Sequence, residues 1–310
     1  MDPDVAFRKT RLKTHFFCFY SDDFVESNNT LQSYSSKVRY KHTIHTNYTK
    51  MDSILKYRGL VWNFVKRDIS SKYVGSLLGL YWSVINPIIT LIVYIIIFGV
   101  FLKVRLPGDS NIWDFALYFA AGFLPWIVFN DSLMRVSRSI IDNKHYIKKV
   151  PFPSEVFPIY VTFSECINLL IGLIIYLGLF CFLKGTPTIF ILLLPLVVIL
   201  QILFTLALGF FLSSGAVFLR DIPQILGAVF MIWFWATPIA YTTAMIPVDF
   251  KWIVMVNPMY YLIEIYRDSL FYGKFPDLAI IVPFIIFIGI LFTAGILFFQ
   301  KTKRGFGELL

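Results

Sequence analysis

The sequence predicts an all-α membrane protein with six transmembrane helices, and three observations lead to this fold class. The chain of 310 residues is 57% hydrophobic and only 15% charged, whereas soluble domains carry about 25% charged residues. Apolar runs of about 18 residues or more recur along it, each long enough to cross a hydrocarbon core. Lysine and arginine are concentrated in alternate connecting segments, as expected for loops on two sides of a membrane.

The first 50 residues differ from the remainder. They are polar, have no helical or strand periodicity, and carry scattered charges of both signs. No apolar segment typical of a signal peptide follows the early basic residues. Residues 1–50 are therefore interpreted as a disordered extension or as a mis-assigned start, because Met51 opens a segment that resembles an ordinary beginning. Residues 51–310 are expected to form a single transmembrane domain.

Residues 53–70 predict an amphipathic helix. Its apolar positions recur every three or four residues, and lysine and arginine occupy the polar positions. A basic amphipathic helix before a membrane span suits the lipid headgroup plane, although a surface helix packed on a partner would show the same pattern. The apolar positions are Ile54, Tyr57, Val61, Phe64 and Val65.

Six apolar segments follow as candidate spans. Pro125 interrupts the second and Pro238 lies near the end of the fifth. With the N-terminus inside, the inner segments hold 22 lysines and arginines and the outer segments hold 6. This distribution predicts that both termini lie in the cytoplasm. It also explains the net charge of +9 by membrane topology, which argues against nucleic acid as a partner. The segments are 80–102, 115–132, 156–183, 188–219, 225–243 and 278–300.

A seventh apolar stretch, 252–272, is not counted as a span. Asn257 and Pro258 interrupt it, and its second half contains several charged residues. It is interpreted as a pair of re-entrant or interfacial helices on the outer face, because non-helical backbone is tolerated at membrane depth when protein covers it.

Familiar catalytic patterns are missing from the sequence. It contains no Walker A motif and no HExxH, GxSxG or GxGxxG pattern. The three cysteines and four histidines are not spaced as metal ligands, so no metal site is expected. Glu165 is the one carboxylate well inside an apolar run. It is a functional candidate, or it hydrogen-bonds to a neighbour near the inner end of its helix.

Two inner loops and a group of aromatic residues also stand out. The basic loop 139–153 ends in Pro-Phe-Pro, which suits either a short helix presented to a cytoplasmic partner or an ordinary loop held by anionic lipid. The adjacent charges of Arg220 and Asp221 indicate a partner contact or a helix cap. Aromatic residues make up 18% of the chain. They suit interfacial belts, but the density around residues 233–241 would also suit a lining on which sugars slide.

Six segments together resemble the membrane subunit of polysaccharide-exporting ABC transporters, over essentially all of residues 51–310. They read KYVGSLLGLYWSVINPIITLIVYIIIFG (72–99), AGFLPWIVFNDSL (121–133), NKHYIKKVPFPSEVFP (143–158), FLRDIPQIL (218–226), WFWATPIAY (233–241) and NPMYYLIEIYRDSLFYG (257–273). Each segment is modest evidence alone, but all six in this order are specific.

The resemblance implies a half-channel in the bacterial inner membrane. Two copies would form the pore, and two ATP-binding subunits, which carry ATP and magnesium, would drive it. The cargo would be a lipid-linked polysaccharide, with O-antigen as the leading candidate. The alternative is a membrane-embedded glycosyl- or acyltransferase of cell-envelope synthesis, which requires converging polar or acidic residues that are not visible in the sequence. A passive channel is disfavoured because no polar or charged filter ring is evident.

The resemblance also implies roles for individual residues. Coupling to the ATPase would involve Asn143, Lys148, Lys149, Pro151, Phe152, Pro153, Arg220 and Asp221. The candidates for sugar contact in the pore are Trp82, Tyr94, Phe234, Trp235 and Tyr241. The outer gate would contain Asn257, Pro258, Tyr260, Glu264 and Arg267.

Overall fold

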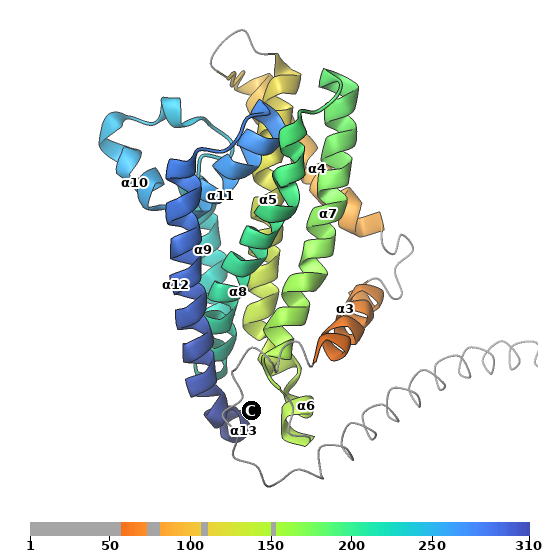
Figure 1. Cartoon of the computed structure of the whole chain (residues 1–310), viewed down its shortest axis with the longest axis vertical. Coiled ribbons are helices and arrows are strands. Elements are labelled where there is room, and N and C mark those ends of the chain that lie inside the picture. Colours follow the sequence, from red (N-terminus) through yellow and green to blue (C-terminus); the bar gives the residue numbers. More distant parts are fainter. Residues whose placement is uncertain (1–56, 73–80, 107–110, 150–152) are drawn as a thin grey trace, which may run out of the picture. The chain divides into compact units, whose positions relative to one another are not determined.

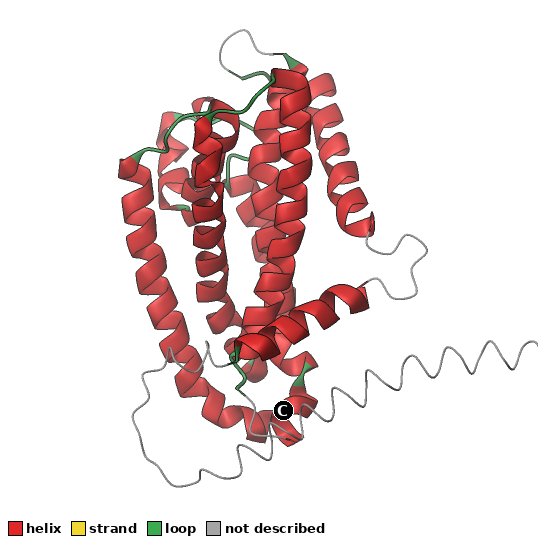
Figure 2. Cartoon of the chain, turned by 45° about the vertical axis from the view of Figure 1, so that its right-hand side comes forward, coloured by secondary structure: helices red, strands yellow, loops and turns green. Residues whose placement is uncertain are grey.

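The computed structural model describes residues 57–72, 81–106, 111–149 and 153–310. Every regular element within these ranges is a helix (Figure 2), so the all-α prediction is confirmed for the described part of the chain. The predicted extension over residues 1–50 lies outside the described residues, as do Pro151 and Phe152 of the predicted coupling loop.

Four of the described helices are long and apolar enough to cross a membrane. They run side by side through the bundle (Figure 1) and correspond to the second, third, fourth and sixth predicted spans. They are α5 (Ile112–Asp142), α7 (Val156–Lys184), α8 (Leu194–Phe218), which follows the 3-10 turn η3 (Ile189–Leu193), and α12 (Leu278–Thr302).

Two shorter apolar helices stand where the first and fifth spans were predicted. The first is α4 (Trp82–Tyr94), which continues as the π-helical segment η2 (Ile95–Phe101). The other is α9 (Ile222–Ala236), which ends seven residues before the predicted limit of 243. Pro238 explains the early end, because a residue before proline disfavours the helical conformation, and Thr237 is extended with φ −103° and ψ 127°.

Helix α5 is longer than predicted at its C-terminal end. It begins with a capping box in which Asn111 and Asp114 exchange side-chain to backbone hydrogen bonds. It then continues ten residues beyond the predicted limit at residue 132. Leu133, Val136 and Ile140 are fully buried there, and this apolar face extends the helix through a segment that its charges had marked as a loop.

The core lies along α5, which packs against α7 and α8, while α8 packs in turn against α12. Phe129 of α5 stacks on Phe204 of α8 with ring centroids 5.1 Å apart. Helix α12 comes close to α8 at Gly295, where a Cβ atom would lie 2.5 Å from the carbonyl oxygen of Ala207. Small residues allow such approaches between membrane helices, whose association depends on close packing.

Shorter elements gather at the two ends of the bundle (Figure 1). One end, called here the α6 end, holds α3 (Arg58–Lys72), α6 (Lys144–Lys149), η7 (Lys303–Gly305) and α13 (Phe306–Leu309). The opposite end, called the α11 end, holds η4 (Thr243–Met245), η5 (Val248–Phe250), α10 (Lys251–Val256), α11 (Pro258–Arg267) and η6 (Asp268–Tyr272).

Candidate functional site

The predicted coupling loop forms the short helix α6, directly after α5. Asn143 ends α5, is buried, and donates hydrogen bonds from Nδ2 to the carbonyl oxygen of Ser139 (2.8 Å) and to the hydroxyl of Tyr160 (3.1 Å). It therefore orients α6 and does not itself offer a surface. Lys148 is exposed on α6, and Lys149 ends the helix. Pro153 lies just before α7, where its carbonyl oxygen accepts from the Val156 amide at 3.1 Å.

Helix α6 is attached to α3 by an aromatic and cationic cluster. The guanidinium of Arg67 donates to the hydroxyl of Tyr146 at 2.6 Å and lies 4.6 Å from the centroid of the Phe64 ring. Phe64 and Tyr146 meet edge to face with centroids 5.6 Å apart. Phe157 and Tyr160 of α7 complete the cluster. A displacement of α6 would therefore be transmitted to α3.

The second predicted coupling contact forms the exposed turn between α8 and α9. Asp221 stands at the N-terminus of α9, and its side chain makes no capping hydrogen bond. Arg220 is also exposed. Capping therefore does not occupy the Asp221 carboxylate, and the role of this turn as a partner contact stays a prediction.

Asn257 fixes the start of α11 at the opposite end. Its Oδ1 accepts from the Met259 amide (3.0 Å) and from the Trp233 indole (2.7 Å), and its Nδ2 donates to the Thr237 hydroxyl (2.7 Å). Pro258 occupies the first turn of α11, where its missing N–H costs nothing. These contacts connect the end of α9 to the start of α11.

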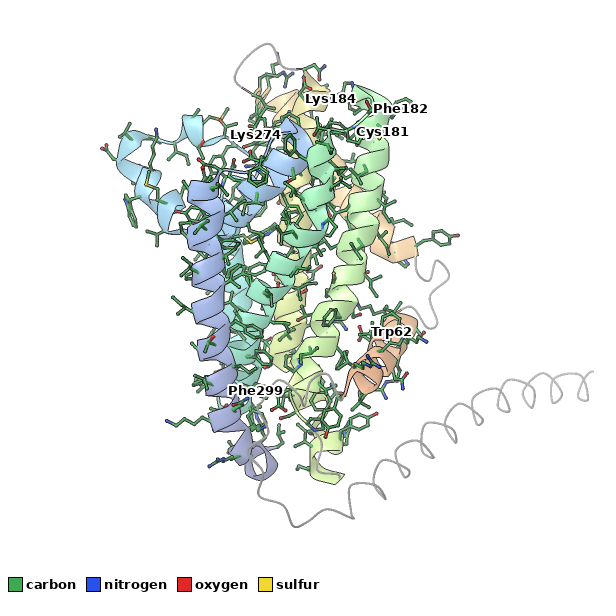
Figure 3. The ribbon with its side chains drawn as sticks, viewed as in Figure 1. Trp62, Cys181, Phe182, Lys184, Lys274 and Phe299 are labelled. Carbon is green, nitrogen blue, oxygen red and sulfur yellow. The ribbon has the colours of Figure 1, made fainter. Side chains whose placement is uncertain are left out.

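Arg267 is fully buried at the end of α11. Its guanidinium pairs with Glu264 at 2.9 Å, donates to the carbonyl oxygen of Ile239 at 3.0 Å, and lies 3.7 Å from the centroid of the Tyr118 ring. A Cβ atom at Gly122 would lie 3.0 Å from the guanidinium, so α5 leaves space for it. Tyr260 lies one turn before Glu264, its ring against that of Tyr261. Lys184 and Lys274 also lie at this end (Figure 3) and pair with Asp114 and Asp268.

The predicted sugar-contact residues fall into two groups. Trp82 and Trp235 are exposed, at 38% and 50% of their surface. Phe234 is buried instead and packs against Tyr94 with ring centroids 5.8 Å apart. The Tyr241 hydroxyl donates to the carbonyl oxygen of Trp235 at 2.6 Å. Tyr94 and Phe234 therefore join α4 to α9, and the two tryptophans are the most exposed rings of this group.

An ion-pair network joins α3 to α5 and α7, and sequence reasoning missed it. The Arg135 guanidinium contacts both Asp68, at 2.6 Å, and Glu165. Lys72 also pairs with Glu165, at 2.9 Å. Glu165 accepts a further hydrogen bond from Asn168 at 2.6 Å, so the interpretation of this carboxylate as a hydrogen-bonded one fits the structure.

The position of Asp68 explains its charge state. Burial alone would raise the pKa of this carboxyl, but hydrogen bonds from Arg135 and Ser164, with the charges of Arg135 and Lys72, hold the pKa below its ordinary value of 3.8. The sequence did contain one signal for the network: the apolar spacing Leu133, Val136, Ile140 continues α5 and turns Arg135 from a loop residue into a helical one.

Comparison with known proteins places the chain in a family. The sequence profile of the ABC-2 type transporters matches residues 59–271. The chain belongs to this family. It is also similar to proteins named O-antigen export system permease protein RfbA. The relative from Myxococcus xanthus is 30% identical over 257 residues, covering 82% of this chain and 96% of the relative. One from Klebsiella pneumoniae is 31% identical over 247 residues, covering 79% and 92%.

The part that matches the ABC-2 profile contains α3 and α6 of the α6 end and nearly all of the α11 end. It stops within η6 and leaves out α12, η7 and α13. Of the four long apolar helices, α12 has the largest exposed share. An ABC-2 chain with these apolar helices is a multi-pass membrane protein. Within the described ranges, no three His, Cys, Asp or Glu side chains come together as metal ligands, and for the whole chain the expected lack of a metal site stays a prediction.

Proposed function

We propose that this chain is the membrane half of an ATP-driven exporter that moves a lipid-linked polysaccharide, O-antigen, out of the cytoplasm. Two findings carry the proposal together. The chain matches the ABC-2 family, and it is similar, over nearly their whole length, to relatives named as O-antigen export permeases. The chain would work as a pair of copies with two ATP-binding subunits, which supply ATP and magnesium.

Six crossings of the bacterial inner membrane, with both termini in the cytoplasm, complete the proposal. Helix α4 and segment η2 have 13 and 7 residues, together about 30 Å and enough for a first crossing. Helix α9 has 15 residues, about 22 Å, which is short of a full crossing. The extended backbone after it is covered, since Thr237, Ile239 and Ala240 are buried, and covered non-helical backbone is tolerated at membrane depth. Helices α10 and α11 then re-enter on the outer face.

Coupling to ATP hydrolysis would act through the α6 end. Helix α6 and the Arg220–Asp221 turn would meet the ATP-binding subunits, and the Arg67–Tyr146 contact would carry movement of α6 to α3. On the pore side, Trp82 and Trp235 are the proposed sugar contacts, because rings that reach the surface can stack on pyranose faces. The cap formed by α10 and α11 would act as the outer gate.

Reconstitution tests this function directly. The full chain and its candidate ATP-binding subunit are placed in liposomes, and ATP-dependent movement of lipid-linked O-antigen is measured. Movement that requires both proteins and ATP supports the proposal. Movement by the chain without the ATP-binding subunit would refute it, and incorporation of sugar or acyl groups into the lipid would favour the transferase alternative.

A variant of Asp221 tests the coupling contact. We expect Asp221→Ala to lower transport and stimulated ATP hydrolysis severalfold while the chain remains in the membrane, because an exposed interfacial charge contributes about 1 kcal/mol. Asp249→Ala, an exposed aspartate of η5 at the α11 end, is the matched control and should leave both rates unchanged. Equal rates in both variants and the unmodified chain would remove the α8–α9 turn from the mechanism.

A further inference from the structure

A cavity of about 590 Å³ lies between α4, α5 and α7, within the size range of small-molecule sites. Its lining includes Trp82, one of the two proposed sugar contacts, but neither Trp235 nor any residue of the cap at the α11 end. Most of its lining is aliphatic, and the charged side chains of the lining gather at one end, nearest α3. The aliphatic lining includes Leu91, Ile92, Ala120, Leu124, Ile175 and Leu179.

The charged end of the cavity has one carboxylate without a counter-ion among the described residues. Lys72 and Arg135 are paired with Glu165, and Arg135 also with Asp68. Asp131 lines the same end and is exposed, but it makes no hydrogen bond or ion pair with a described residue. Two cations and two carboxylates therefore line the cavity, and Asp131 is the group that still needs a positive partner.

The cations retain donors for an additional ligand. A lysine ammonium has three N–H donors and an arginine guanidinium has five. Lys72 uses one donor at hydrogen-bonding distance, toward Glu165, and Arg135 contacts two carboxylates. The end of the cavity can therefore donate to an anionic group and, at Asp131, accept from a cationic one. That combination matches a zwitterion.

The length of the cavity matches one lipid leaflet. Asp131 and Ala116 both line it and lie 15 residues apart on α5, which is about 22 Å along the helix. Half of a bilayer, headgroups included, is about 20 Å deep. On α7 the lining runs in the same direction, from Glu165 near the charged end to Leu179.

We propose that this cavity holds a membrane glycerophospholipid with an ethanolamine headgroup. The ammonium would bind Asp131, the phosphate would bind Lys72 and Arg135, and one acyl chain would lie along the aliphatic lining. Phosphatidylglycerol carries no ammonium and therefore lacks the group that Asp131 needs. A polyprenyl pyrophosphate would add two or more negative charges to an end that already holds as many carboxylates as cations.

The headgroup sets the selectivity of this site. An acyl chain gains little by leaving the bilayer for an aliphatic cavity, because lipid tails are as apolar as leucine. The acyl chain determines where the lipid lies, and the pairing of its headgroup with Asp131 determines which lipid is bound. The lipid proposal does not require the exported cargo to bind in this cavity, so export by a protein that fails to bind the lipid would leave the proposed function intact.

Native mass spectrometry of the purified full-length chain tests the proposal. Phosphatidylethanolamine, phosphatidylcholine and phosphatidylglycerol are titrated separately, and the retained lipid is counted. We expect phosphatidylethanolamine to be retained most strongly. Asp131→Asn should weaken its retention about tenfold, the size of one hydrogen bond to a charged group. Asp142→Asn is the matched control, since Asp142 is an exposed aspartate of α5 outside the cavity.

A second pair of variants tests the position of the acyl chain. Ile175 lines the cavity and Ile174 does not, although both are exposed on α7. Ile175→Trp should reduce retention of phosphatidylethanolamine, and Ile174→Trp should not. The proposal is overturned if the three lipids are retained equally, if Asp131→Asn matches the unmodified chain, if both tryptophan variants behave alike, or if a polyprenyl phosphate displaces phosphatidylethanolamine.

Discussion

The two ends of the bundle are held by different kinds of contact. At the α11 end, Arg267 has no exposed side-chain surface and binds a backbone carbonyl oxygen as well as Glu264. Where α3 joins the bundle, Arg135 is 33% exposed and its contacts are to carboxylates. Removing a buried ion-pair partner leaves an uncompensated charge, whereas water can replace a partly exposed contact.

This difference indicates which end can move. Releasing α3 exposes charges that water can solvate, so its attachment can break and form again during a transport cycle. Releasing α11 would leave the Ile239 carbonyl oxygen without its partner and would take the Arg267 guanidinium away from the Tyr118 ring of α5. The cap therefore keeps its internal structure and moves, if at all, as a unit with the neighbouring part of α5.

Replacing the two arginines tests this comparison with the largest expected effect. We expect Arg267→Met to lower the free energy of unfolding by about 3–5 kcal/mol, the cost of breaking a buried pair. Arg135→Met should cost less than half as much. Chemical unfolding of the purified full chain in detergent measures both. Lys251→Met, an exposed lysine of α10, is the control and should change stability by no more than about 0.5 kcal/mol. Equal costs for the two arginines would break the comparison.

A substitution in α5, with a smaller expected effect on stability, tests whether Arg267 depends on the space that α5 leaves for it. Gly122→Ala puts a Cβ atom 3.0 Å from the guanidinium and 3.1 Å from the Ile263 side chain. We expect a loss of about 1–3 kcal/mol from this overpacking. Gly178→Ala in α7, where nothing lies within 4 Å, should be neutral or stabilising, because alanine favours a helix over glycine by about 1 kcal/mol. If both variants unfold alike, the close contact at Gly122 is without consequence.

The sequence predicted the long helices well and the ends of the bundle less well. Apolar length alone located α7 and α12 to within two residues, and α8 together with the preceding turn η3 to within one, because a lipid environment constrains such segments strongly. Helix α5 was predicted too short, since the charges at Arg135 and Arg138 indicated a loop. Those charges lie on a helix whose opposite face is buried.

The contacts across the fold were beyond sequence reasoning for a physical reason. Asp68 and Arg135 are 67 residues apart, and Arg267 and Ile239 are 28 apart. No local periodicity records such pairs. The aromatic lining shows the same limit: Phe234 and Trp235 are neighbours in sequence, yet one is buried and the other exposed. The packing of α9 against α5 and α4 decides which of them faces outward.

The Asp68 carboxyl gives the attachment of α3 a defined pH dependence. Its pKa is held below 3.8 in the folded chain, so its contribution is complete above that pH and is lost as the pH falls through the lowered value. The rate of hydrogen exchange of the α3 amides, corrected for the intrinsic effect of pH on exchange, should stay constant from neutral pH to about 5. The corrected rate should rise in stronger acid. Amides of α11 serve as the internal reference.

Asp68→Asn separates this carboxyl from the others near it. In this variant the α3 amides should exchange faster at neutral pH. The rise of their exchange rate in acid should be smaller by the part that Asp68 contributes. Loss of α11 protection at the same pH as α3 protection would mean that the two ends are not independently held.

The smallest expected effect concerns the hydroxyl of Tyr146. Tyr146→Phe removes the 2.6 Å hydrogen bond from Arg67 but keeps the ring against Phe64. We expect a loss of about 0.5–1.5 kcal/mol, the net value of one hydrogen bond, and faster exchange of α3 amides with no change at α11. Tyr81→Phe, on a ring that is 71% exposed, should leave both unchanged. Because Tyr146→Phe retains the aromatic packing, a loss equal to that of Tyr146→Ala would show that the hydroxyl alone connects α6 to α3, and no loss at all would show that the ring alone does so.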